Sequence, residues 1–182
     1  MQEIEHIDIA LFLFLNKGIA NPVFDVLCPL FRNKLFWIPL YVLLFAWFAK
    51  QYKWKALWIL AFSGLVILLC DQISASLIKP YFARLRPCNT VELASEMRVL
   101  VHCGSGFSFV SSHAANHFGL SFFLLPLFKN KLVKLLLLFW AATISFSQIY
   151  VGVHFPIDVL CGALLGAAIG AVLAFIFRKH IL

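Results

Sequence analysis

The chain alternates between long apolar runs and short polar segments rich in lysine and arginine. A membrane-spanning helix needs about 20 apolar residues, within a range of about 17–25. Four runs meet this length, at residues 56–78, 109–128, 135–153 and 155–177. A fifth run, residues 35–49, is short and spans only if residues 29–31 belong to it and the flanking Arg32 and Lys34 snorkel to the interface. The pattern predicts an all-α bundle of transmembrane helices.

The N-terminal segment, residues 1–33, has a different pattern. Its apolar runs at residues 7–15 and 23–31 are too short to span a bilayer, and a polar NKGIANP sequence separates them. We expect interfacial or re-entrant helices here, with a sixth span as the alternative. Residues 1–182 should then form one polytopic domain with five or six membrane helices.

Composition agrees with this reading and excludes an ordinary soluble domain. Hydrophobic residues make up 63% of the chain and charged residues only 13%, whereas soluble domains average about 45–50% and about 25%. Mean hydropathy is +0.93. The net charge of +7 does not indicate nucleic-acid binding, because the basic residues sit mainly at the ends of apolar runs, where they set membrane topology.

The charges of the loops predict an orientation. Eight basic residues and no acidic ones fall in loops that share one side of the membrane if the predicted spans alternate; they are Lys50, Lys53, Lys55, Lys129, Lys131, Lys134, Arg178 and Lys179. The positive-inside rule makes that side, and the C-terminus, cytoplasmic. The long loop at residues 80–108 and the turn at residues 152–156 then face the opposite side of a bacterial inner membrane.

The last apolar run carries Gly162, Gly166 and Gly170 at four-residue spacing. Small residues at this spacing allow helices in a membrane to approach closely. His154 and Asp158 continue the same helical face, so we expect this pair to point into the bundle. Ionisable groups at membrane depth are costly and therefore mark functional sites by default.

Polar side chains gather at three predicted helix ends on the side away from the cytoplasm, between residues 79 and 158. The three clusters are Lys79, Arg84 and Arg86; Ser111, Ser112, His113, Asn116 and His117; and Gln148, His154 and Asp158. Taken singly, each has an ordinary explanation as a flanking cation, a helix cap or a packing contact. Together they suit a phosphate ester, because cations and a helix N-terminus bind phosphate while a histidine can attack phosphorus.

The spacing of these residues resembles the type 2 phosphatidic acid phosphatase family, which is related to the vanadium haloperoxidases. The family signatures are K-x6-R-P, P-S-G-H and S-R-x5-H-x3-D, and they occur here in the same order. Lys79 to Pro87 match the first signature, whereas the second reads Val110-Ser111-Ser112-His113 and the third begins Ser147-Gln148 before His154 and Asp158.

The resemblance implies a role for each matched residue. His154 would be the nucleophile that forms a phosphohistidine, oriented by Asp158, and His113 would be the general acid. Phosphate would be bound by Lys79, Arg86, the backbone of Ser111 and Ser112, and Gln148. We expect neither a metal ion nor another cofactor, because the cations supply the charge stabilisation.

Gln148 departs from the motif, since it removes one positive charge from the expected phosphate site. Arg84 is close enough in sequence to compensate, but we interpret it as a surface residue. Asp71 either orients Lys79 or makes a structural polar contact. His117 and Asn116 are interpreted as residues that line or support the site.

Cys88 and Cys103 share the long outer loop, fifteen residues apart. Disulfides persist on the oxidising side of the membrane, so we expect a bridge in preference to two free thiols. Closing a loop of this size contributes roughly 3 kcal/mol to stability. The bridge would join the first phosphate-binding signature to the second.

The function predicted from the sequence is an integral-membrane lipid phosphatase. Undecaprenyl diphosphate, phosphatidylglycerophosphate and phosphatidate are the substrates considered first, with a lipid A phosphate as the alternative. Two readings of other classes remain: a membrane protein binding metal or haem through its histidines, and a transporter with a His–Asp proton relay. The expected partners are a lipid phosphate and the bilayer, without nucleic acid, and nothing in the pattern bears on oligomeric state.

Overall fold

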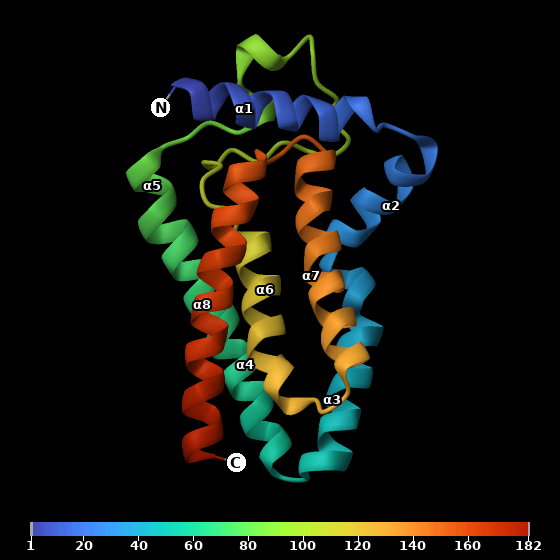
Figure 1. Cartoon of the computed structure of the whole chain (residues 1–182), viewed down its shortest axis with the longest axis vertical. Coiled ribbons are helices and arrows are strands. Elements are labelled where there is room, and N and C mark those ends of the chain that lie inside the picture. The colour runs from blue at the N-terminus through green and yellow to red at the C-terminus, as the bar shows by residue number, and fades with distance from the viewer. Residues whose placement is uncertain (1, 182) are drawn as a thin grey trace.

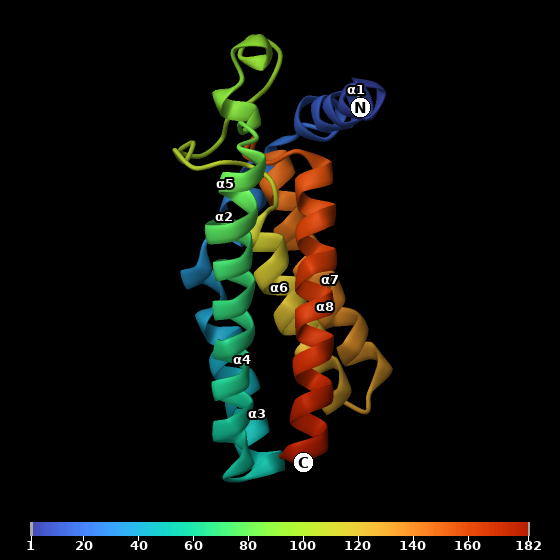
Figure 2. The ribbon, with the colours of Figure 1, turned by 90° about the vertical axis from the view of Figure 1, so that its left-hand side faces the viewer.

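The computed structural model describes residues 2–181, apart from the side chain of Gln2. Over this range the chain forms eight α-helices, which are joined by loops and by short 3₁₀ or π-helical turns. Five of the helices run side by side along the long axis of the molecule (Figures 1 and 2). They are α3 (Ile38–Tyr52), α4 (Lys55–Asp71), α6 (Ser112–Leu124), α7 (Lys131–Tyr150) and α8 (Pro156–His180).

Four helical stretches are long and apolar enough to cross a membrane: Lys34–Tyr52, Lys55–Leu93, Lys131–Tyr150 and Pro156–His180. The second includes α4, a π-helical segment at Gln72–Ile78, and the short α5 at Lys79–Phe82. The predicted all-α, multi-pass architecture is therefore confirmed, but the described residues give four spans, or five if a bent N-terminal pair is one span, where five or six were predicted. Each stretch corresponds to an apolar run in the sequence.

One predicted span is shorter than expected. We predicted a full span at residues 109–128, but α6 has only 13 residues and begins at Ser112. Ser111 caps this helix, and a 3₁₀ turn containing Pro126 follows it at Leu125–Leu127. Proline lacks an N–H and disfavours continuation of an α-helix. The short α6 lies in the centre of the bundle, packed against α4, α7 and α8.

The N-terminal segment folds as two short helices. Helix α1 (Gln2–Leu13) lies across one end of the bundle, and α2 (Pro22–Arg32) descends beside α7 (Figure 1). The helical pair Glu3–Gly18 and Pro22–Arg32 bends by 113° and counts as a broken span or a re-entrant loop. The bend fits the predicted interfacial or re-entrant helices and equally the alternative of a further span. Residues 29–31 belong to α2, and Lys34–Tyr52 is long enough to span without them, so the condition that we predicted for this span is wrong.

The glycine stripe of α8 brings α6 and α8 into backbone contact. A Cβ atom at Gly162 would lie 2.4 Å from the carbonyl oxygen of Ser111, and one at Gly166 would lie 2.0 Å from that of Ala115. Only a residue without a side chain fits at these points. As a result, the start of α6 lies against the first turns of α8, where the Ser111 N–H donates to the Asp158 carbonyl at 2.9 Å.

The polar loops are divided between the two ends of the molecule. The α3–α4 turn, the α6–α7 connection and the C-terminal end of α8 lie together at one end (Figure 1). These segments carry the eight basic residues of the predicted cytoplasmic side. At the other end lie α1, the α7–α8 turn and the long loop after α5, which projects beyond the helices (Figure 2).

Candidate active site

His154 and Asp158 lie at the end of the bundle that carries α1. His154 is in the turn between α7 and α8, and Asp158 is in the first turn of α8. The Asp158 carboxylate accepts the backbone N–H of Phe155 at 2.9 Å, which caps the helix and fixes the carboxylate. Both side chains are buried, with His154 2% exposed. The nearest oxygen of Asp158, Oδ2, lies 3.6 Å from Nδ1 of His154.

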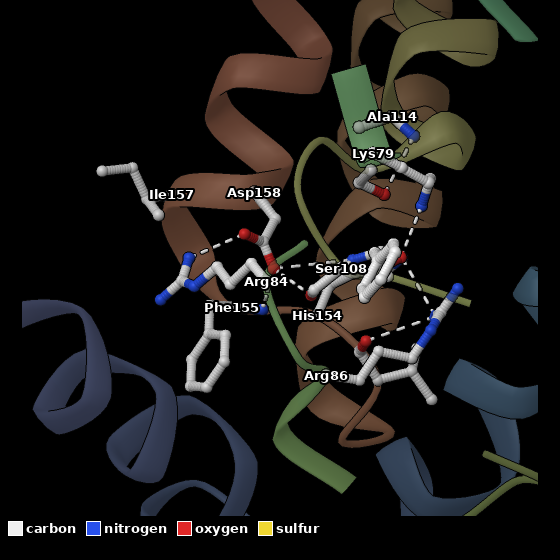
Figure 3. Close-up of polar contacts among 12 residues, drawn as sticks. Lys79, Arg84, Arg86, Ser108, Ala114, His154, Phe155, Ile157 and Asp158 are labelled. Carbon is white, nitrogen blue, oxygen red and sulfur yellow. Dashed lines mark hydrogen bonds and ion pairs between the residues drawn. The ribbon is translucent and has the colours of Figure 1, made fainter. Parts of the chain in front are cut away.

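Ser108 bridges this pair. Its hydroxyl oxygen lies 3.3 Å from Nδ1 of His154, and its O–H donates to Oδ2 of Asp158 (Figure 3). The network favours the tautomer in which Nδ1 carries the proton and donates to Ser108. Sequence reasoning missed Ser108, because the resemblance places only Ser111, Ser112 and His113 in this region.

Arg86 contacts the other ring nitrogen of His154. Its Nη1 lies 3.3 Å from Nε2, while its Nε donates to the Gly106 carbonyl at 2.8 Å (Figure 3). With Nδ1 protonated, Nε2 carries a free lone pair directed at a guanidinium. A group held by Arg86 would therefore sit beside a nitrogen able to act as a nucleophile.

Burial determines the charge of His154. Removal from water lowers the pKa of His154 to about 4, opposed by the hydrogen bond and charge of Asp158 and assisted by the charges of Arg86 and Lys79. The imidazole is thus neutral at neutral pH, which is the form a nucleophile requires.

Lys79 supports the loop that carries Ser108. It is almost fully buried, and its Nζ donates to the Phe107 carbonyl at 2.9 Å. The Ser108 N–H donates in turn to the Arg84 carbonyl at 2.7 Å. The structure therefore brings Lys79, Arg86 and His154 together around one loop, as their motif spacing predicted.

Arg84 is not the surface residue that we expected. Its guanidinium pairs with Asp158 at 2.7 Å and with Asp8 of α1 at 2.6 Å, and it lies over the Phe155 ring. Figure 3 shows it on the opposite side of Asp158 from His154. Asp8 also accepts the Ile157 N–H at 2.9 Å, so it links α1 to the start of α8. Arg84 thus fixes the carboxylate and does not replace the charge missing at position 148.

Gln148 is fully buried beneath the active-site turn. Its backbone carbonyl accepts the N–H groups of Val153 at 3.1 Å and His154 at 3.2 Å. Its side-chain oxygen accepts from Nε of Arg32, at the end of α2, at 3.1 Å. Sequence reasoning took Arg32 for a snorkelling flank and missed this contact, because α2 is remote from every motif in the sequence.

The start of α6 differs in part from expectation. Ser111 caps the helix, with its hydroxyl oxygen 3.5 Å from the N–H of Ala114, and its own N–H is bound to Asp158. The Ser111 N–H is therefore not free for phosphate, contrary to our expectation. Ser112 accepts a hydrogen bond from Ser74 at 2.8 Å through its side chain. The N–H groups of Ser112 and His113 come next at a helix end, where intrahelical partners are lacking.

A cavity of about 600 Å³ opens beside this helix start, between α3, α4 and α6. Its polar end is formed by Arg32, Asp71, Ser112, His113, Asn116 and His117. His117 contacts the His113 carbonyl through Nδ1 at 2.8 Å, and Oδ1 of Asn116 is buried without a partner among the described residues. Aromatic and aliphatic side chains form the remaining wall, including Tyr41, Phe45, Phe48, Leu60 and Ile67.

Asp71 was expected either to orient Lys79 or to make a structural contact, and the histidines are the ligands of the alternative metal or haem site. Asp71 lines the cavity, while the ammonium group of Lys79 donates to Phe107. Across the described part of the chain, no three His, Cys, Asp or Glu side chains gather in a way that could hold a metal ion.

Cys88 and Cys103 form a disulfide in the structure, with their Cα atoms 6.1 Å apart. The bridge joins the turn just after Arg86 to the segment just before Gly106, whose carbonyl accepts from Arg86. The loop that presents Arg86 to His154 is thereby closed covalently.

Known structures share this architecture. The crystal structure of Aquifex aeolicus LpxE matches with a TM-score of 0.71 and 28% identity, covering 94% of each chain. The structure of the first transmembrane PAP2 type phosphatidylglycerolphosphate phosphatase from Bacillus subtilis matches with a TM-score of 0.73 and 25% identity, covering 99% of this chain and 89% of that one.

Relatives and a family model agree with the structural likeness. A lipid A 4'-phosphatase of Bacteroides thetaiotaomicron is 38% identical over 117 residues, which is 63% of this chain and 52% of the relative. The chain spans about half the length of the curated relatives it matches. The model of the PAP2 superfamily matches residues 52–181, well over half of the chain and all three motifs. The chain therefore belongs to the PAP2 superfamily.

Proposed function

We propose that the protein is a lipid phosphatase that removes a phosphate group from a membrane lipid through a phosphohistidine on His154. The observation that carries the proposal is the position of Arg86 Nη1, 3.3 Å from Nε2 of His154, while Ser108 contacts the other ring nitrogen. A phosphoryl group bound by Arg86 would have its phosphorus next to a neutral, oriented nucleophile.

Two displacements would complete the reaction. In the first, the Nε2 lone pair bonds to phosphorus and the bond from phosphorus to the lipid oxygen breaks, while His113 passes to that oxygen the proton that a monoanionic phosphate brings into the site. In the second, His113 takes a proton from water, the water oxygen bonds to phosphorus, and the N–P bond breaks to release phosphate. Asp158, through Ser108, would stabilise the positive ring of the intermediate, and Lys79 and Arg86 the phosphoryl oxygens.

The cavity beside His113 supports a lipid substrate. Its apolar wall could take part of an acyl or isoprenoid chain while the phosphate reaches the polar end. The relative from Bacteroides thetaiotaomicron is named a lipid A 4'-phosphatase. We therefore place a lipid A phosphate first among the substrates, ahead of phosphatidylglycerophosphate, phosphatidate and undecaprenyl diphosphate. The basic loops support an inner-membrane location with the site on the extracytoplasmic face.

Phosphate release by the purified chain in detergent, measured on a panel of these four lipids, tests the proposal. We expect His154→Ala and His113→Ala each to lower turnover by roughly a thousandfold or more, since each removes a group that acts on the reacting atoms. His180→Ala is the matched control, because His180 is exposed near the C-terminus. Vanadate should inhibit the wild-type protein by mimicking pentavalent phosphorus.

Full activity in His154→Ala would exclude the phosphohistidine mechanism. Absence of phosphate release from every lipid in the panel, with a folded protein, would instead favour the transporter or metal-binding readings. Flux assays in vesicles and metal analysis separate those two outcomes.

A further inference from the structure

We propose that Arg32 binds the substrate phosphate and supplies, from α2, the guanidinium that the family motif places at position 148. This inference rests on the proposed function. It assigns a binding role to a residue that lies outside the region matched by the family model, at residues 52–181.

The contact between Arg32 and Gln148 fixes the direction of both side chains. The amide nitrogen of Gln148 lies 3.3 Å from the carbonyl of Ile144 in its own helix, so its oxygen is left for Nε of Arg32 at 3.1 Å. A guanidinium has five N–H donors. Binding through Nε leaves the Nη1 and Nη2 groups available to a ligand, and Arg32 lines the same cavity as His113.

The charge environment of Arg32 differs from that of Arg84 and Arg98. Arg84 pairs with Asp8 and Asp158, and Arg98 pairs with Asp25 at 2.5 Å. Within residues 3–181, no carboxylate lies at ion-pair distance from Arg32, and its side-chain partner, Gln148, is neutral. Its charge instead acts on Arg86 and His113, which are themselves part of the proposed phosphate site.

Like charges in a partly buried site repel one another, so this grouping is unfavourable without an anion. A phosphate monoester carries about −1.5 to −2 charges at neutral pH and accepts the planar, forked hydrogen bonds of arginine. Arg32 and Arg86 together would offset that charge. The arrangement therefore keeps two guanidinium groups for the proposed phosphate site, although the motif arginine is replaced.

An ordinary explanation for Arg32 is a cation at a helix C-terminus, where it complements the helix dipole. That role requires only an exposed side chain near the end of α2. It does not account for the hydrogen bond to a fully buried glutamine under the active-site turn. The contact joins α2 to the position from which the motif would deliver its own arginine.

A charge-exchange experiment on the full-length protein tests the inference. We expect Arg32→Gln to lower kcat/KM by roughly a hundredfold, the size of effect seen when one donor to transition-state charge is removed. Inhibition by vanadate and by inorganic phosphate should weaken in the same variant. The double variant Arg32→Gln with Gln148→Arg should regain much of the loss, because the guanidinium then comes from α7.

Two single variants separate phosphate binding from a structural role. Gln148→Met removes the hydrogen bond to Arg32 but leaves the positive charge of Arg32 in place. We therefore expect a much smaller loss of kcat/KM than in Arg32→Gln. Lys17→Gln removes a positive charge from an exposed position outside the site and is the charge-matched control. The thermal stability of each variant shows whether the fold is intact.

The inference fails if Arg32→Gln keeps near-wild-type activity and phosphate inhibition while His154→Ala is inactive. It also fails if Gln148→Met is as damaging as Arg32→Gln, or if the double variant shows no recovery. Absence of phosphate release by the wild-type protein would instead count against the proposed function itself.

Discussion

At the scale of single residues, the site depends on how His154 is oriented and kept neutral. Ser108 and Asp158 contact one ring nitrogen, Arg86 contacts the other, and the ring is almost completely removed from water. Burial favours the neutral ring, whereas the Asp158 carboxylate favours the charged one. Burial is the larger effect, so the ring stays neutral through the pH range in which an exposed histidine would titrate.

This balance predicts the titration of His154. Because burial lowers the pKa of His154 to about 4 from an ordinary 6.5, the ring should gain its proton only near pH 4. Between these values the unfolded chain binds the extra proton and the folded chain does not, so this group makes stability fall as pH falls. NMR of protein labelled at the histidine nitrogens measures the pKa, with His154→Ala identifying the signal. A midpoint at pH 6.5 or above would contradict the prediction.

The residues of the motifs could be predicted from the sequence because their spacing is itself the signal. His154, Asp158 and Arg86 meet as expected. Ser108 and Arg32 could not be predicted in the same way, since loop closure and the packing of α2 on α7 bring them to the site. Arg84 was misread because its partner Asp8 is remote in sequence and approaches only when α1 crosses the end of the bundle.

At the scale of helices, the bundle depends on the close contact between α6 and α8. The glycine spacing of α8 predicted this contact, and the structure shows backbone oxygen atoms of α6 directly over the glycines. The length of α6 could not be predicted from hydropathy, because the apolar run continues past both helix ends. Capping by Ser111 and the turn at Pro126 define those ends.

Gly166→Ala tests this contact. The added Cβ would lie 2.0 Å from the Ala115 carbonyl oxygen, so α6 and α8 would have to separate. Such overpacking destabilises proteins by roughly 1–3 kcal/mol. We expect a lower thermal unfolding temperature in detergent and reduced phosphate release, because the start of α6 moves relative to Asp158.

Gly64→Ala is the control for that measurement. Gly64 lies in α4 with no atom within 4 Å of an added Cβ, so the same substitution there meets open space. Its unfolding temperature should equal or exceed that of the wild type, since alanine favours helix more than glycine does. Equal unfolding temperatures for the two variants would contradict the prediction, because they would show that α6 and α8 accommodate the added Cβ without loss of stability.

At the scale of the whole molecule, the lysine- and arginine-rich loops and the candidate active site lie at opposite ends. The α3–α4 turn, the α6–α7 connection and the end of α8, which carry the eight basic residues, gather at one end, and the α7–α8 turn and the loop after α5 lie at the other (Figure 1). The positive-inside rule and the need of disulfides for an oxidising compartment are independent arguments, and both support our proposal that the site faces away from the cytoplasm. This separation could be predicted from the sequence, because the positions of lysine and arginine between the apolar runs show which loops are basic.

Thiol labelling of spheroplasts tests the polarity and the disulfide together. With a maleimide that does not cross membranes, we expect labelling only after treatment with an impermeant reductant, because Cys88 and Cys103 are bridged and face outward. The variant with both cysteines replaced by serine should remain unlabelled, since Cys28 and Cys70 are buried and Cys161 lies within α8. The same variant should lose roughly 3 kcal/mol of stability with the loop closure.

Labelling of the wild type without reductant would show that the bridge is absent. Labelling that requires inverted membrane vesicles would place the loop, and with it the catalytic residues, on the cytoplasmic side.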